Sequence, residues 1–364
     1  VTPVNNKDKN SFDEYRDQLF WQTTAAEVLG RIGDPQAVEP LFRVLLDPTK
    51  GDCSVTALLA LVKLGKPSAD AAAKLLKSDY EKLQAYQSRR IKEASGNEAK
   101  GAPWVTAAAL VLGTGGRPEA GPALIAALES EKDEATHTLL TSELAKVPAT
   151  PESIEAFKKA FKAVPLGSLP ELSEAIGRFL DPELVPWMLE TAGSLKGADN
   201  DKEAAQAALV ETALKIAKPS QIADVKAAAV KFEADRAKSL LTQVEPLLAA
   251  CKEDANCYLD AIQKGDNQSE ANQFIGIKAG YMIGIVGNEG TRDKLIDGLS
   301  KISNAALRYV SAQAIDHLTP KGSKTVAEKL RKIIDENAKS PDKDKSSGDN
   351  TLKQVMYRLD ARAG

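Results

Sequence analysis

Residues 33–41 read Gly-Asp-Pro-Gln-Ala-Val-Glu-Pro-Leu, and this phrase decides the fold class of the 364-residue chain. It joins two apolar stretches and recurs as Gly-Lys-Pro-Ser-Ala at residues 65–69 and as Gly-Arg-Pro-Glu-Ala-Gly-Pro-Ala-Leu at residues 116–124. A glycine can end a helix in the left-handed conformation without steric cost, and a proline can start the next helix, where its missing N–H is not needed. Each copy therefore predicts a turn between two helices.

The turns recur at a nearly regular distance. Their prolines stand at positions 35, 67, 118, 151, 182 and 219, so that successive turns are 32, 51, 33, 31 and 37 residues apart. Four of these five distances suit a two-helix repeat. Apolar residues follow helical spacing, as in Val38, Leu41, Phe42 and Leu45, and no stretch alternates apolar with polar residues. We therefore predict an all-α protein of helix pairs with no sheet.

The composition excludes several classes of protein. Apolar residues make up 43% of the chain, which is typical of a globular protein. No run approaches the ~20 apolar residues that a membrane span requires. The 48 basic side chains are balanced by 51 acidic ones, which argues against a surface built to cover nucleic-acid phosphates. Two histidines and three cysteines offer few ligands for zinc, and we expect no metal or other cofactor.

The helix–turn–helix units resemble HEAT repeats, and most closely the short bacterial HEAT-like repeats of the phycobilin-lyase class. The resemblance is specific at residues 33–46 and 116–128 and covers the chain from about Phe12 to about Leu359. It implies an α-solenoid of about eight stacked helix pairs in a right-handed superhelix. Such proteins are usually scaffolds or binding surfaces, although a few members of the broader class act on bilins or on alkylated DNA.

Four consecutive segments are expected along the chain. They are a flexible lead at 1–11, the solenoid at 12–338, a mobile polar loop at 339–350 and a capping helix at 351–364. The loop contains the Asp-x-Asp-x-Ser opening of a calcium site at 342–346. Its glycine comes one position late, and Lys353 stands where the chelating glutamate belongs, so calcium binding at 342–349 is left open.

The 51-residue distance contains an insertion at residues 80–103. Insertions in repeat proteins often lie on the binding face, and tyrosine, tryptophan and arginine are enriched at binding hot spots. The candidate partner-binding residues in and directly after it are Tyr80, Tyr86, Arg89, Arg90 and Trp104. The alternative interpretation is an extended helix and a solvated loop whose aromatic side chains pack back on the solenoid.

The cysteines bear on the compartment. Cys251 and Cys257 flank a polar segment that is typical of a turn between helices, and such a turn can bring two α-carbons within the roughly 4.4–6.8 Å that a disulfide needs. The spacing also resembles a cysteine pair of exported bacterial HEAT-repeat proteins. Two free thiols or half of a metal site are the alternatives. Cys53 lies in an apolar stretch and is expected to be a small buried side chain.

A Cys251–Cys257 bond would indicate an oxidising compartment. We therefore expect the bacterial cell envelope or periplasm, with the cytoplasm as the alternative. Residues 1–11 lack an initiator methionine and an apolar signal core. This start is compatible with a trimmed chain, with a mature N-terminus after signal removal, and with a lipid tether outside the given sequence.

No set of residues predicts an active site. His137 and His317 are far apart in sequence, and the chain has neither a Gly-x-Ser-x-Gly nucleophile elbow nor a phosphate-binding loop. We predict a non-catalytic scaffold, monomeric alone, that binds another protein through the concave solenoid surface and the segment 80–104. The alternatives are an enzyme or enzyme subunit resembling bilin lyases, a nucleic-acid-binding solenoid, and a structural spacer.

Overall fold

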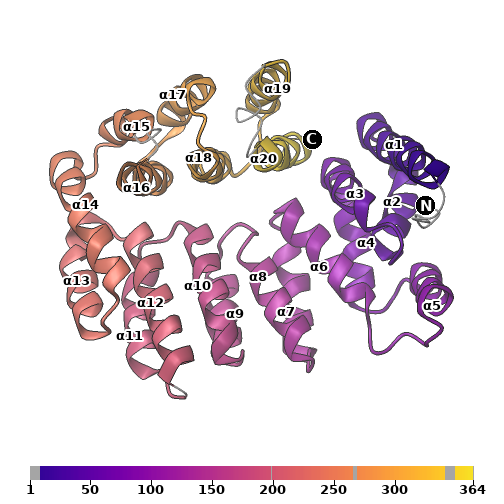
Figure 1. Cartoon of the computed structure of the whole chain (residues 1–364), viewed down its shortest axis with the longest axis horizontal. Helices are drawn as coiled ribbons and strands as arrows, with labels where there is room; N and C mark the ends of the chain where they lie inside the picture. The colour runs from indigo at the N-terminus through magenta and orange to yellow at the C-terminus, as the bar shows by residue number, and fades with distance from the viewer. Residues whose placement is uncertain (1–8, 198, 265–268, 341–348, 364) are drawn as a thin grey trace. The chain divides into compact units, whose positions relative to one another are not determined.

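The computed structural model describes residues 9–197, 199–264, 269–340 and 349–363. Within these residues the chain forms twenty α-helices, five short 3-10 helices and no β-strand, which confirms the predicted all-α fold (Figure 1). The chain divides into two compact units. Unit 1 extends to Ala156 and takes in Asp360–Arg362, and unit 2 covers Phe157–Leu359.

Unit 1 is a stack of helix pairs with one additional helix, α5. Helices α1, α3, α6 and α8 pack one against the next in one layer, and α2, α4 and α7 form a second layer (Figure 1). The last helix, α9, contains the boundary with unit 2. The helices are α1 (Lys9–Ile32), η1 (Pro35–Ala37), α2 (Val38–Leu46), α3 (Gly51–Leu64), α4 (Lys66–Leu76), α5 (Glu81–Ser95), α6 (Trp104–Gly115), α7 (Ala120–Ser130), α8 (Glu134–Leu144) and α9 (Pro151–Phe161).

The glycine–proline turns form as predicted. Gly33, Gly65 and Gly116 follow α1, α3 and α6 with φ angles of 76°, 68° and 56°. This left-handed conformation is unfavourable for residues with a side chain, so glycine is the residue that ends these helices at least cost. Pro35 and Pro67 then stand in the first turn of the next helical segment, where no backbone N–H is required.

The core of unit 1 follows the predicted apolar stripes. Leu41 and Phe42 on α2 are almost completely buried, and Leu46 is buried in place of the half-buried Leu45. Cys53 on α3 is 1% exposed, which confirms its assignment as a small buried side chain. The layers approach closely at Gly113 on α6, where an added Cβ would lie 2.9 Å from a backbone oxygen of α8.

Unit 2 continues with helix pairs of the same kind. Helices α10, α12, α16 and α18 pack in succession, and α15 and α17 pack beside them (Figure 1). The elements are η2 (Leu166–Ser168), α10 (Leu169–Ile176), η3 (Gly177–Phe179), α11 (Leu184–Ser194), α12 (Asp199–Ile216), η4 (Pro219–Gln221), α13 (Ile222–Lys231), α14 (Asp235–Cys251), α15 (Ala255–Lys264), α16 (Glu270–Val286), α17 (Glu289–Gly298), η5 (Leu299–Lys301), α18 (Ala305–His317), α19 (Lys324–Ala338) and α20 (Asp349–Arg362).

The C-terminal helix α20 buries the apolar face that its sequence predicts. Its Leu352, Val355, Met356 and Leu359 are all buried. Its first residue, Asp349, accepts a hydrogen bond from the buried guanidinium of Arg308 on α18. The candidate calcium positions 342–348 lie outside the described residues. At the other end of the chain, α1 already begins at Lys9, within the segment expected to be a flexible lead.

Candidate functional site

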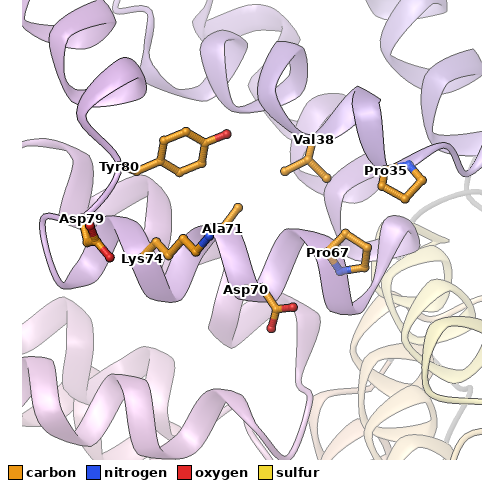
Figure 2. Close-up of a pocket in the computed structure, with 8 residues that line it drawn as sticks. All are labelled: Pro35, Val38, Pro67, Asp70, Ala71, Lys74, Asp79 and Tyr80. Carbon is orange, nitrogen blue, oxygen red and sulfur yellow. The ribbon is translucent and has the colours of Figure 1, made fainter.

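Unit 1 contains an open groove with a volume of about 450 Å³, which we call the proline-turn groove (Figure 2). Its walls come from three places: the start of the η1–α2 segment, one face of α4, and the turn between α4 and α5. The lining residues are Pro35, Val38, Pro67, Asp70, Ala71, Lys74, Asp79 and Tyr80. The groove therefore joins two successive repeats to the beginning of the insertion.

The repeated turn explains why the groove lies here. Pro35 and Pro67 are equivalent residues of two copies of the phrase, and α2 and α4 stack side by side. Asp70, Ala71 and Lys74 follow Pro67 at intervals of three, four and seven residues, so they share one face of α4. Packing of neighbouring repeats thus brings corresponding faces of α2 and α4 to one surface.

The groove carries both signs of charge and one aromatic ring. Asp70 accepts hydrogen bonds from Lys66 Nζ at 2.8 and 2.7 Å. Lys74 and Asp79 are exposed and form no ion pair within the described residues. Tyr80 and Lys74 lie toward one end of the groove and the two prolines toward the other (Figure 2). The chemistry available is recognition rather than proton transfer, since no nucleophile–base pair lines the groove.

Two other candidates, Tyr86 and Arg90, hold α5 against α2. The Tyr86 hydroxyl donates to Asp47 Oδ2 at 3.1 Å, and Arg90 Nε donates to the same oxygen at 2.9 Å. Asp47 follows the last residue of α2 and its side chain is 1% exposed. The two residues that were selected for their type therefore make contacts within the protein, and a role in partner binding stays a prediction for them.

The electrostatics of this contact keep Asp47 ionised. Burial acts to raise the pKa of Asp47, but hydrogen bonds from Arg90, Thr49 and Tyr86 outweigh it and hold the pKa below its usual value. Burial and the negative charge of Asp47 both raise the pKa of the Tyr86 phenol. A carboxylate and a neutral phenol therefore face each other, with the Arg90 guanidinium balancing the charge.

The remaining candidates differ in accessibility. Arg89 is exposed, with its Cζ 5.7 Å from the centroid of the Tyr86 ring and an ion pair to Glu93 at 3.7 Å. Trp104 begins α6 and is half-buried, and its indole N–H has no hydrogen-bond partner within the described residues. Tyr80 is half-buried and is the one of the five that lines the groove.

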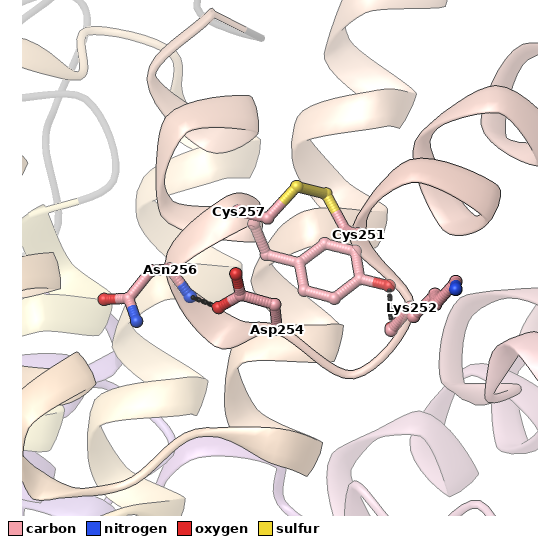
Figure 3. Close-up of a disulfide and its surroundings, with 6 residues drawn as sticks. Cys251, Lys252, Asp254, Asn256 and Cys257 are labelled. Carbon is pink, nitrogen blue, oxygen red and sulfur yellow. Dashed lines mark hydrogen bonds between the residues drawn. A yellow bond between two sulfur atoms is a disulfide. The ribbon is translucent and has the colours of Figure 1, made fainter.

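The predicted disulfide lies in unit 2 (Figure 3). Cys251 ends α14 and Cys257 lies in the first turn of α15, with their α-carbons 5.3 Å apart. The turn is also fixed by the Asp254 N–H, which donates to the Cys251 carbonyl at 2.8 Å, and by the Tyr258 hydroxyl, which donates to the Lys252 carbonyl at 2.6 Å. The bond therefore links the C-terminal end of α14 to the first turn of α15.

The sequence analysis missed a buried lysine in unit 2. Lys278 on α16 is completely buried, and its Nζ donates to the carbonyls of Lys215 at 3.1 Å and Ala217 at 2.5 Å. The last carbonyls of a helix have no hydrogen-bond donor within that helix. At the C-terminal end of α12, the Lys278 ammonium group is the donor for two of them. Burial lowers the pKa of Lys278 to about 7. Its signal in the sequence is a lone charge inside the apolar run 274–286.

The described residues contain neither a metal-binding cluster nor a helix that could span a membrane. No three or more histidine, cysteine, aspartate or glutamate side chains gather there in a way that would hold a metal ion. None of the helices in those ranges combines the length and the apolar character that crossing a bilayer demands.

The family model of the PBS lyase HEAT-like repeat matches residues 21–47. This segment contains the second half of α1, the turn at Gly33 and Pro35, and α2, so the match is to one helix pair. The stacked helix pairs of both units share this architecture, which is consistent with an all-α solenoid of HEAT-like repeats. No curated protein matches the chain. The architecture is that of a repeat scaffold.

Proposed function

We propose that this protein is a non-catalytic scaffold that binds another protein through the proline-turn groove and the exposed side of α5. The groove is the observation that carries the proposal. It combines two equivalent proline turns, an aromatic ring and the exposed Lys74, which has no ion pair within the described residues. HEAT-like repeats generally act through surfaces made by neighbouring units, which is the origin of this groove.

The shape of the groove favours a protein segment over a small molecule. Sites for small molecules are concave, mostly apolar and bury most of the ligand. The proline-turn groove is open and has charged walls formed by Asp70, Lys74 and Asp79. We expect an extended segment of the partner to lie across Pro35 and Pro67 and to place a carboxylate near Lys74. The groove offers too little enclosed apolar surface to bury a tetrapyrrole.

Charge reversals at Lys74 on α4 and at Lys77, directly after its last residue, test this proposal. Lys74 lines the groove, and Lys77 is also exposed but does not line it. We expect tagged wild-type chain and Lys77→Glu to recover the same protein from cells of the source organism, and Lys74→Glu or Tyr80→Ala to lose it. Equal recovery by Lys74→Glu and Lys77→Glu would show that the partner binds elsewhere.

We further propose that the scaffold works in an oxidising compartment, namely the bacterial cell envelope or periplasm. The Cys251–Cys257 bond supports this assignment, because disulfides persist in such compartments and are rare in the cytosol. The measurement is the intact mass of protein whose thiols are blocked at the moment of cell lysis. We expect two cysteines to react only after reduction. Two thiols that are already blocked before reduction would contradict the assignment.

A further inference from the structure

Helix α1 has an unusual concentration of exposed apolar side chains. Seven large apolar side chains of the described residues are strongly exposed, and five of them lie on α1. A sixth, Val55, lies on α3, which packs directly against α1. On α1, Trp21 is 68% exposed, Ile32 67% and Val28 45%. Single exposed apolar residues are ordinary, but a continuous patch marks a surface that another molecule covers.

Three of these residues form one stripe on the face of α1 that points away from α3. Trp21, Val28 and Ile32 are separated by seven and four residues, which places them on the same side of a helix. Gly30 lies half a turn away from the stripe and packs against Ala60 of α3, where an added Cβ would meet the Ala60 α-carbon at 2.9 Å. The stripe is therefore the side of α1 that carries no neighbouring helix among the described residues of unit 1.

Two aromatic rings provide much of the exposed apolar area of α1. The ring of Phe20 meets that of Trp21 edge-on, with 5.4 Å between the centroids. At aromatic side-chain areas of 150–250 Å², these two rings alone expose roughly 250 Å². This face of α1 is apolar, and in the stack it is equivalent to the face of α3 on which α1 itself packs.

The charges beside the stripe are arranged so that the helix is complementary to a second copy of itself. Along α1 the order is Asp17, Trp21, Val28 and Arg31, an acidic residue, two apolar residues and a basic residue. Two copies of such a helix are complementary when they run antiparallel, because the acidic end of each copy then lies beside the basic end of the other and the apolar residues face each other. Asp17 is exposed and has no ion pair within the described residues, and Arg31 is exposed beside Glu27 at 2.6 Å.

We propose that two copies of this chain dimerise through their α1 helices, packed antiparallel about a two-fold axis close to Ala25. In this register Trp21 packs against Val28 of the second copy, and Asp17 pairs with Arg31 of the second copy. The exposed Ala25 lies at the axis, where its small side chain lets the two backbones approach. This proposal replaces the expectation of a monomer and is independent of the proline-turn groove.

The size of the stripe sets the expected affinity. A standard stable interface buries about 800 Å² on each partner, and smaller interfaces are weak. The stripe, its flanking charges and Phe20 extend from Asp17 to Ile32, about four turns on one side of a single helix, so we expect a dissociation constant in the micromolar range. Dimer and monomer should therefore exchange within the concentrations used for sedimentation.

Sedimentation of the full chain with two matched valine substitutions tests the proposal. Val28 lies in the stripe and is 45% exposed, and Val230 on α13 lies outside it and is 63% exposed. We expect the wild-type chain to dimerise with concentration, Val28→Glu to raise the dissociation constant more than about tenfold, and Val230→Glu to leave it unchanged. Circular dichroism verifies that both variants fold. A wild-type chain that is monomeric at about 100 µM would overturn the proposal, as would equal effects of the two substitutions.

Two further variants test the register. Asp17→Arg and Arg31→Asp should each weaken the dimer, and the double variant should restore it, because the charge pair is rebuilt with its signs exchanged. Ala25→Cys should form a reversible covalent dimer on oxidation, since Cys53 is buried and the other two cysteines are bonded to each other. A dimer that resists the charge reversals and gives no cross-link at position 25 would refute the antiparallel α1 contact.

Discussion

Breaking the Cys251–Cys257 bond should loosen one helix pair and leave the rest of the protein unchanged. The two cysteines are six residues apart, so the bond closes a short loop. In the chain-entropy account, closing about six residues removes about 7 cal/mol/K from the unfolded chain, which corresponds to about 2 kcal/mol at 25 °C. Repeats contact mainly their neighbours, and we therefore expect this loss to appear in α14 and α15.

Amide hydrogen exchange with and without reductant measures the effect helix by helix. A loss of about 2 kcal/mol corresponds to roughly 30-fold faster exchange through local opening. We expect this acceleration for peptides from Asp235–Cys251 and Ala255–Lys264, while peptides from α3 and α6 serve as the internal control. Reduction is cleaner than substitution, because Cys251 is only 3% exposed and serine there would bury a hydroxyl.

A variant without the bond supplies the second control. In Cys251→Ser/Cys257→Ser, exchange should be fast in α14 and α15 and should not respond to reductant. If the oxidised and reduced wild-type chains exchange at the same rate in α14 and α15, the bond does not stabilise this junction. An acceleration spread evenly over both units would instead contradict the neighbour-by-neighbour stability that we infer from the repeat architecture.

Three further predictions concern other parts of the fold. Arg90→Ala should destabilise unit 1 by about 2 kcal/mol in chemical denaturation, because it leaves the buried Asp47 carboxylate without its charged partner. Arg89→Ala removes only an exposed ion pair and should change stability by less than about 0.5 kcal/mol. The pKa of Lys278 is lowered to about 7 in the folded protein, so above that pH the unfolded chain binds more protons than the folded one. The free energy of unfolding should therefore rise between pH 7 and about 10, and Lys278→Met should remove this rise from the measured pH profile. Gly113→Ala should cost about 1–3 kcal/mol, since its Cβ would meet the backbone of α8, whereas Gly115→Ala enters open space and should leave the melting temperature unchanged or higher.

The fold was predictable because its signals are local. A glycine that must adopt positive φ and a proline that must start a helix stand beside each other at Gly33 and Pro35, so a few residues specify the turn. The pairing of Cys251 with Cys257 is local in the same sense, since the turn between two consecutive helices is enough to bring their α-carbons to 5.3 Å.

The site was less predictable, because it depends on packing between segments that are distant in sequence. Tyr86 and Arg90 were candidates for partner binding because of their residue types, but both donate hydrogen bonds to Asp47. Asp47 lies about 40 positions earlier, and no local sequence pattern indicates that it is buried. Likewise, Pro35 and Tyr80 line one groove only because α2 and α4 stack. The apolar face of α1 was present in the sequence, but whether another helix covers it is a property of the packed structure.

The claim that the proline-turn groove binds a protein partner is tested most directly by photo-crosslinking from position 80 in cells of the source organism. A photoreactive phenylalanine at Tyr80 should give one discrete cross-linked protein, and the added substitution Lys74→Glu should abolish the product, while the same group at Val230 should give none. The absence of a product at position 80, or a product that Lys74→Glu leaves intact, would contradict the account.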